Sequence, residues 1–228
     1  MRIVAIETVE TRGSIAVLQD DRVLADRQLD PKLRSAQSLA PGLAELLDRV
    51  GWRPADVELV AVATGPGSFT GLRIGVTTAK TFAYAVGCQV IGVHTLLAIA
   101  DQVPADVPRF SVVLDAQRSE LFVADFSRSA GGELVGQETT RIVRCQDWLE
   151  SLAAGSIVTG PGLTKLHERL PAGVGLVDAP LWLPAAATIG RVGWRSFSAG
   201  QRDDVFDLVP RYFRRTAAEE QWDRKQTP

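Results

Sequence analysis

The stretch Gly65-Pro66-Gly67-Ser68-Phe69-Thr70-Gly71-Leu72-Arg73-Ile74-Gly75 decides the fold, because it joins a predicted strand to a predicted helix. The apolar run Leu59–Ala63 before it, bounded by glycine and proline, is typical of a buried strand. The glycines permit backbone angles with φ > 0, and Ser68 and Thr70 are both candidate N-caps. Such a turn either binds a phosphate or carboxylate with its N–H groups or is purely structural. It lacks the Gly-Lys-Ser/Thr of a Walker A loop and the glycine spacing of a dinucleotide site.

The helix predicted over Thr70–Val86 carries a row of small residues at intervals of four: Gly71, Gly75, Ala79 and Ala83. These residues share one face of a helix. Because glycine inside a helix costs on the order of 1 kcal/mol relative to alanine, we expect a packing reason for the row. The row packs on the chain's own sheet or on the Leu39–Val50 helix, or it forms a seam for a second protein chain, and the two interpretations do not exclude each other.

Upstream of this motif the sequence predicts a meander, a helix and a further strand, and downstream it predicts one more strand and a helix. The helix begins at Ser35 or Ser38, ends at Val50 and carries an apolar stripe that includes Leu39, Leu43 and Leu46. The expected strands are Ile3–Ile6, Gly13–Leu18, Val23–Leu29, Val57–Thr64 and Gln89–Val93, followed by a helix over Thr95–Val103.

The second half repeats the first. Thr-Gly-Pro-Gly occurs at Thr64–Gly67 and again at Thr159–Gly162, each time after a predicted strand and before a predicted helix. Each half also opens with a hairpin whose first strand ends in an acid, Glu7 or Asp115. The further elements expected are strands over Phe110–Leu114, Glu120–Phe126 and Ser156–Val158, one near Leu134, and helices over Asp147–Ala153, Leu163–Leu170 and Thr188–Ala199.

This order predicts an α/β protein with a duplicated actin, sugar-kinase and heat-shock-ATPase-like fold, each half being a mixed sheet flanked by helices. We expect a first half over residues 1–104 and a second over 105–228, with the C-terminal tail packing back on the first. In that fold, hairpins and turns of both halves face a nucleotide. We expect no cofactor of the chain's own, with ATP or ADP as a candidate ligand at the cleft or at a partner interface. The candidate nucleotide-binding residues are Glu7, Gly65, Gly67, Ser68, Asp115, Gly160 and Gly162. Either acid is alternatively a solvated strand end.

Composition narrows the alternatives. The 228 residues carry a formal net charge of −2 and 46% hydrophobic residues, as in ordinary globular proteins, with no overall signal for nucleic acid or membrane. Two separate cysteines fit a reducing compartment, and the apolar start is too short for a signal peptide, so we expect a cytoplasmic protein. His94 and His167 are the only histidines and lack metal-ligand spacing, and no Gly-x-Ser-x-Gly elbow occurs. The sequence therefore offers no metal site and no catalytic residue.

The tail carries a basic cluster at Arg211, Arg214 and Arg215. It is either a solvated chain end or a contact for RNA phosphates or an acidic partner.

The run Gly65–Gly75 resembles the signature of the TsaB (YeaZ) family. Weaker resemblances follow in the same order along most of the chain: Arg2–Thr8, Ile91–Leu96, Leu114–Arg118 with Glu120–Phe122, and Pro210–Arg214.

The resemblance implies a role in the threonylcarbamoyl modification of adenosine next to the anticodon of tRNA. In that family the protein is a non-catalytic scaffold that pairs with TsaD, a related glycoprotease-like protein with metal-binding histidines, and with the ATPase TsaE. The resemblance places the TsaD contact on the helices Ser35–Val50 and Thr70–Val86, with a homodimer through the same surface. The partner-binding residues it implies are Leu39, Leu43, Leu46, Gly71, Gly75, Ala79 and Ala83.

Two positions depart from the family pattern. Glu7 replaces the usual aspartate, and Arg34 stands where a histidine is usual. The rival interpretation is an enzyme that acts alone, either an ATP-binding kinase of the actin-like group or a glycoprotease.

Overall fold

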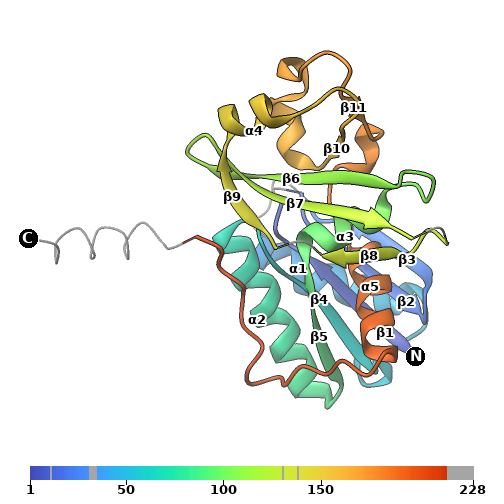
Figure 1. The fold of residues 1–228 in the computed structure, drawn as a ribbon. Coiled ribbons are helices and arrows are strands. Elements are labelled where there is room, and N and C mark those ends of the chain that lie inside the picture. The colour runs from blue at the N-terminus through green and yellow to red at the C-terminus, as the bar shows by residue number, and fades with distance from the viewer. Residues whose placement is uncertain (11, 31–34, 130, 138, 215–228) are drawn as a thin grey trace, which may run out of the picture.

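The computed structural model describes residues 1–10, 12–30, 35–129, 131–137 and 139–214. Two mixed sheets, each flanked by helices, lie one above the other (Figure 1). The first half contains β1 (Arg2–Glu7), β2 (Ser14–Gln19), β3 (Arg22–Gln28), α1 (Ser35–Arg49), β4 (Leu59–Gly65), α2 (Phe69–Val86), β5 (Gln89–His94) and α3 (Thr95–Gln102). The second contains β6 (Arg109–Gln117), β7 (Glu120–Arg128), β8 (Leu134–Gln137), β9 (Arg141–Arg144), α4 (Cys145–Ser151), β10 (Ile157–Thr159), β11 (Gly175–Leu176) and α5 (Ala186–Ser198).

The two sheets have the same topology. The first has the strand order β3-β2-β1-β4-β5, with β1 antiparallel to β2 and parallel to β4. The second has the order β11-β10-β6-β7-β8, with β6 antiparallel to β7 and parallel to β10. Strand β9 pairs with β7 beside β8. The duplicated α/β fold expected from the repeated Thr-Gly-Pro-Gly turn is therefore confirmed.

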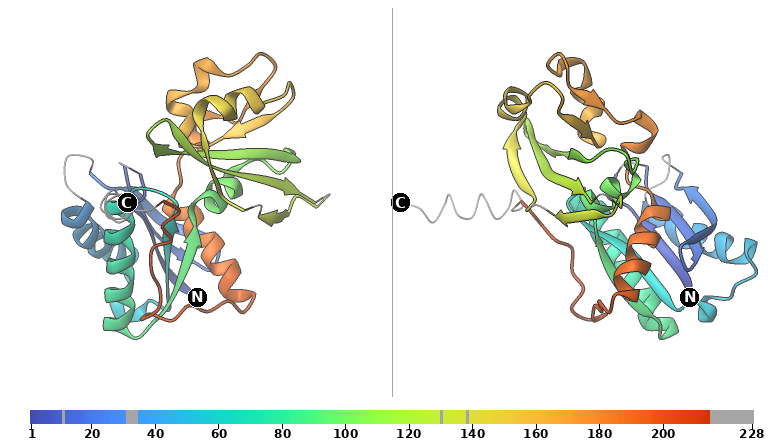
Figure 2. Two further views of the ribbon diagram at one scale, coloured as in Figure 1. Left: turned by 60° about the vertical axis from the view of Figure 1, so that its left-hand side comes forward. Right: turned by 45° about the vertical axis from the view of Figure 1, so that its right-hand side comes forward.

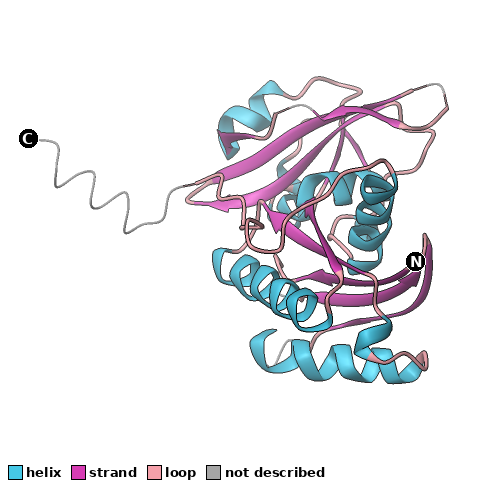
Figure 3. Ribbon diagram, turned by 90° about the horizontal axis from the view of Figure 1, so that it is seen from below, coloured by secondary structure: helices cyan, strands magenta, loops and turns pink. Residues whose placement is uncertain are grey.

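Helices cover both faces of the first sheet (Figure 3). On one face, α1 and α2 pack on alternate side chains of the strands, including Val4, Ile6, Val60 and Val62. On the other face, α5 packs against β1, β2 and β4. The first sheet is thus buried on both sides, which explains why all seven residues of β4 are buried.

The last helix of each repeat packs across the halves. Leu96 and Ile99 of α3 join the hydrophobic core of the second sheet, whereas Ile189 and Val192 of α5 join that of the first. This exchange means that the sequence range 105–228 contributes a helix to the first sheet. The boundary expected between residues 104 and 105 stays a prediction.

One predicted helix in the second half is wrong. The segment expected to be helical over Leu163–Leu170 forms two short 3₁₀ turns, Pro161–Lys165 and His167–Arg169. The carbonyl of Leu163 accepts from the N–H of Leu166 and also lies 3.0 Å from Nδ1 of His167. Because this carbonyl is already occupied and the segment is short and ends at Pro171, the tighter 3₁₀ turn is favoured over an α-helix.

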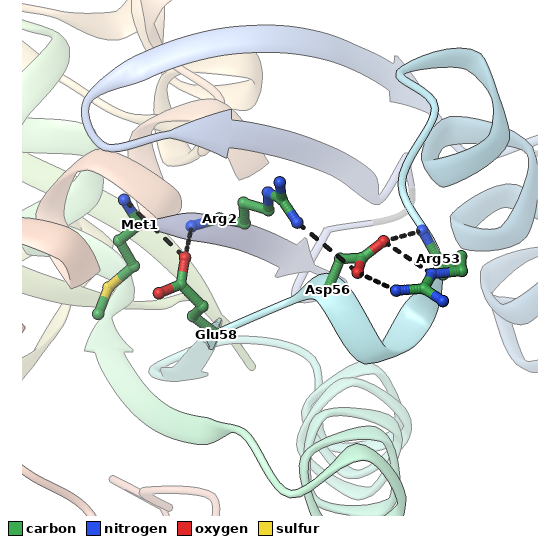
Figure 4. A network of polar contacts seen from close by, with 5 residues as sticks. All are labelled: Met1, Arg2, Arg53, Asp56 and Glu58. Carbon is green, nitrogen blue, oxygen red and sulfur yellow. Dashed lines mark hydrogen bonds and ion pairs between the residues drawn. The ribbon is translucent and has the colours of Figure 1, made fainter.

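The start of the chain is fixed by a polar network at the N-terminal ends of the neighbouring strands β1 and β4 (Figure 4). The N–H of Arg2 donates to Glu58 at 2.7 Å, and the N–H and guanidinium of Arg53 donate to Asp56. The Arg53 contacts hold the pKa of Asp56 at about 2.

Among the described residues, no helix is long and apolar enough to cross a membrane.

Candidate functional site

A cleft of about 1430 Å³ lies between the two halves. The first half contributes the turn Thr8–Glu10 and the loop Pro66–Thr70 to its lining. The second half contributes the hairpin Leu114–Arg118 and Lys165, and the segment Arg211–Arg214 closes one side. The cleft therefore lies where the duplicated turns face each other.

The loop after β4 is held tightly against the turn after β1. Ser68 caps α2, since its Oγ accepts from the N–H of Gly71 at 3.2 Å. The N–H of Ser68 donates to the carbonyl of Val9 at 3.1 Å. A Cβ at Gly67, where φ is +157°, would lie 2.5 Å from Cβ of Val9, so a larger residue would separate the loop from the turn. These contacts support a structural role for the glycines, and phosphate binding by the loop stays a prediction.

Glu7 lies beneath the cleft rather than in it. Its side chain is fully buried, and Oε1 accepts from the N–H groups of Val9 and Glu10 at 2.6 and 3.2 Å. Its other oxygen, Oε2, has no hydrogen-bond partner among the described residues. Burial raises the pKa of Glu7 to about 8, an effect that the two N–H donors only partly offset. At neutral pH Glu7 is therefore mainly protonated, and its Oε1 holds the turn after β1.

Asp115, the strand-end acid of the second half, has a different environment from Glu7. Asp115 lines the cleft and is partly exposed. Its Oδ2 pairs with Nζ of Lys165 at 2.7 Å, and its Oδ1 accepts from the N–H of Gln117 at 2.7 Å. The carboxylate raises the pKa of Lys165. The equivalent strand-end acids of the two repeats thus have opposite environments, one buried and neutral, the other paired in the cleft.

Three of the seven candidate nucleotide-binding residues border the cleft: Gly67, Ser68 and Asp115. Glu7, Gly65, Gly160 and Gly162 are not part of its lining in the described chain. A Cβ at Gly160, where φ is +112°, would lie 2.2 Å from the carbonyl oxygen of Val113, so this glycine serves close packing on β6. Whether ATP or ADP binds in the cleft stays a prediction.

The side chains assigned to partner binding lie in the core of the chain itself. Each is 3% exposed or less, or is a buried glycine: Leu39, Leu43, Leu46, Gly71, Gly75, Ala79 and Ala83. A Cβ at Gly75 would lie 2.3 Å from Oγ1 of Thr8. The spacing of these residues therefore reflects packing on the chain's own sheet. The surface that α1 and α2 offer to a partner is formed by their remaining, exposed residues.

Neither histidine is among the described residues that line the cleft. His94 is 8% exposed at the end of β5, and its Nε2 lies 3.1 Å from Oγ1 of Thr140. Burial, together with the charge of Arg211, lowers the pKa of His94 to about 4. His167 lies beside Trp182 in the second half. In the described chain, no group of three His, Cys, Asp or Glu side chains is placed to hold a metal ion.

Sequence reasoning missed several residues of the cleft. Arg118, Lys165, Tyr212 and Phe213 line it, although none was a candidate. Tyr212 and Phe213 were detectable as an apolar pair in a polar tail; Arg118 and Lys165 carry no such signal. Of the basic cluster, Arg214 is paired with Glu120 and Arg211 is exposed, while Arg215 lies outside the described residues, as does Arg34.

Comparisons with known proteins agree with this fold. The family model described as TsaD, tRNA N6-adenosine threonylcarbamoyltransferase, matches residues 32–158. The chain is 29% identical to the tRNA threonylcarbamoyladenosine biosynthesis protein TsaB of Escherichia coli, over 96% of each protein. It is 30% identical to TsaB of Bacillus subtilis, over 97% of this chain and 98% of the relative.

A solved structure extends this likeness to the fold. YeaZ from Pseudomonas aeruginosa superposes with a TM-score of 0.77 at 25% identity, covering 93% of this chain and 99% of that one. The family model matches more than half of the chain, and the TsaB relatives match nearly all of it. The chain belongs to the TsaB (YeaZ) family of tRNA threonylcarbamoyladenosine biosynthesis proteins.

Proposed function

We propose that this protein is a non-catalytic subunit that binds and activates TsaD for the threonylcarbamoyl modification of adenosine next to the anticodon. TsaE is a further partner, and tRNA meets the protein through the complex in the cytoplasm. The near full-length similarity to TsaB proteins supports a role in this modification.

The observation that carries the non-catalytic role is the position of the histidines. TsaD is expected to hold its metal with histidines, and this sequence has only His94 and His167. They lie in different halves, and neither is among the described residues that line the cleft. The strand-end acid of the first half, Glu7, is buried and protonated, so it does not offer a carboxylate to a ligand.

We place the TsaD contact on the outward faces of α1 and α2. The two helices lie side by side on one face of the first sheet, and their inner faces are buried. The exposed positions of α1 include Ala40 and Ala44, and those of α2 include Thr77 and Thr81. Small side chains at these positions let a partner helix approach closely. In the absence of TsaD, a second copy of this chain occupies the same surface.

Co-elution with purified TsaD tests this placement. Ala44→Arg and Thr81→Arg add long charged side chains to the proposed contact without changing the core. We expect each to weaken the complex at least tenfold and to shift the isolated protein from dimer to monomer. Ala153→Arg, at an exposed position after α4, is the matched control and should bind normally. Undiminished binding by both helix variants would refute the placement.

A further inference from the structure

The chain after α5 forms an extended strap, defined here as Asp203–Arg214, that crosses from the first half to the second. It runs from the end of α5 past the outer edge of β5, along α2, and reaches the hairpin between β6 and β7 (Figures 1 and 2). Its last four residues line the cleft.

The strap is anchored first at the edge of the first sheet. Asp203 forms an isolated antiparallel bridge with Val90, and its Oδ2 accepts from the N–H of Gly92 at 2.8 Å. Nζ of Lys80, on α2, donates to the carbonyls of Phe206 and Leu208, both at 2.9 Å. These contacts hold the first part of the strap beside α2.

The strap is anchored again beside the loop that opens α2. The N–H of Arg211 donates to the carbonyl of Thr64 at 2.7 Å. The ring of Tyr212 stacks on Phe69 with centroids 4.7 Å apart, and its hydroxyl accepts from Nε of Arg73 at 3.1 Å. The strap is thus tied to the same loop that lines the cleft.

Its last two described residues make the crossing. The ring of Phe213 lies 6.1 Å from that of Phe122 in β7 and 5.5 Å from that of His94 in β5. The guanidinium of Arg214 donates to the carbonyl of Ala116 at 2.7 Å and pairs with Glu120. Arg214 therefore binds both sides of the β6–β7 hairpin, with a charge-assisted pair among its contacts.

The strap lies away from the connections between the halves. The chain passes from the first half to the second after α3 and returns just before α5, so both passages lie beside these two helices (Figure 2). The strap crosses on the side of α2 instead (Figure 1). The cleft thus has a hinge side and a side closed by the strap.

We propose that the strap is a clasp that sets the opening between the two halves, with Arg214 as its latch on the β6–β7 hairpin. The contacts with the first half are spread over its length, whereas those with the second half are concentrated at Phe213 and Arg214. The clasp therefore opens at its Arg214 end while its remaining length stays bound to the first half. A ligand or partner that displaces the hairpin must release Arg214, which couples the occupancy of the cleft to the strap.

Pulsed electron–electron double resonance measures the distance between the two halves directly. Spin labels at Thr70→Cys and Thr164→Cys, in a Cys88→Ala/Cys145→Ala background, report the distance across the cleft from exposed positions on its opposite walls. In the otherwise unchanged protein we expect one narrow distance distribution. In Arg214→Ala we expect the mean distance to lengthen by several ångströms and the distribution to broaden.

Two further variants keep the test decisive. Glu120→Gln removes the charged partner of Arg214 and should lengthen the distance in the same direction even if Arg214→Ala does not fold. Arg211→Ala removes an equal charge from the strap, but the contact of Arg211 with Thr64 uses the main chain, so this control should leave the distribution unchanged. Distributions of Arg214→Ala and Glu120→Gln that superpose on the unmodified one would overturn the proposal. So would an equal lengthening in Arg211→Ala.

Discussion

The hydroxyl of Thr8 donates a 2.7 Å hydrogen bond to the main-chain oxygen of Gly71, which joins the end of β1 to the first turn of α2. The contact is close enough that a Cβ at Gly71 would lie 1.8 Å from the carbonyl oxygen of Thr8. The glycines of α2 therefore allow the strand end and the helix to touch, and this contact fixes the loop that lines the cleft.

Gly71→Ala should destabilise the protein despite the higher helix propensity of alanine. The new methyl group meets main-chain atoms of Thr8, and overpacking of this kind costs about 1–3 kcal/mol or more. Urea unfolding followed by circular dichroism measures the loss. Thr77→Ala, at an exposed position of the same helix, should change stability by less than about 0.5 kcal/mol. Equal stability of the two variants would show that the strand and helix separate easily.

Ser68→Ala should lower stability by about 1 kcal/mol, because Ser68 caps α2 through the N–H of Gly71. The sequence leaves Ser68 and Thr70 as equal candidates, and the structure assigns the cap to Ser68. Thr70→Ala is thus the control, with little expected effect in the same urea titration. The opposite ranking of the two variants would place the start of α2 at Thr70.

Glu7 should make the protein less stable as the pH rises from about 4.5 to about 8. The unfolded chain releases the Glu7 proton near pH 4.5, whereas the folded chain keeps it until about pH 8. The unfolded state therefore binds fewer protons in this window, and folding loses stability with each added pH unit. Glu7→Gln removes this effect and should be more stable than the unmodified protein at pH 8, by on the order of 1–3 kcal/mol. Urea titrations at pH 5 and pH 8 check this, and the gain should be smaller at pH 5. A gain independent of pH would contradict a protonated Glu7.

His94 changes the pH dependence of folding stability in the opposite direction from Glu7. Its pKa falls from 6.5 to about 4 on folding, so the unfolded state binds more protons between these values. Stability should therefore fall as the pH drops from about 6.5 to about 4, by on the order of 1–3 kcal/mol. Titration of the His94 ring by NMR should give a pKa well below 6.5. A normal pKa would mean that water reaches the ring between Thr140 and Phe213.

The repeated turn was enough to predict the topology. Thr64–Gly67 and Thr159–Gly162 occupy equivalent positions at the ends of β4 and β10, where a buried parallel strand turns sharply into α2 in the first half and into a 3₁₀ turn in the second. The strand-end acids were also placed correctly in the sequence order, as β1 and β6 begin their repeats. The full burial of Glu7 and the pairing of Asp115 with Lys165, 50 residues further along the chain, could not be foreseen from a local pattern.

The residues assigned to partner binding show what helical periodicity cannot predict. A row such as Gly71, Gly75, Ala79 and Ala83 shows that something packs closely on one face, but not whether that is a partner or the chain's own β1 and β4. The structure shows the chain's own strands. The strap was missed for a related reason, because Tyr212 and Phe213 contact Phe69 and Phe122, which are more than 90 residues away in the sequence. No local pattern reports such a contact.

Reconstituted tRNA modification tests the proposal that this chain enables TsaD. Purified TsaD and TsaE, threonylcarbamoyl-adenylate and unmodified tRNA would be combined with and without this protein, and threonylcarbamoyladenosine would be quantified by mass spectrometry. We predict product only when TsaD and this chain are both present, and none from this chain without TsaD. Product formed by this chain in the absence of TsaD, or full activity of TsaD in the absence of this chain, would contradict the account.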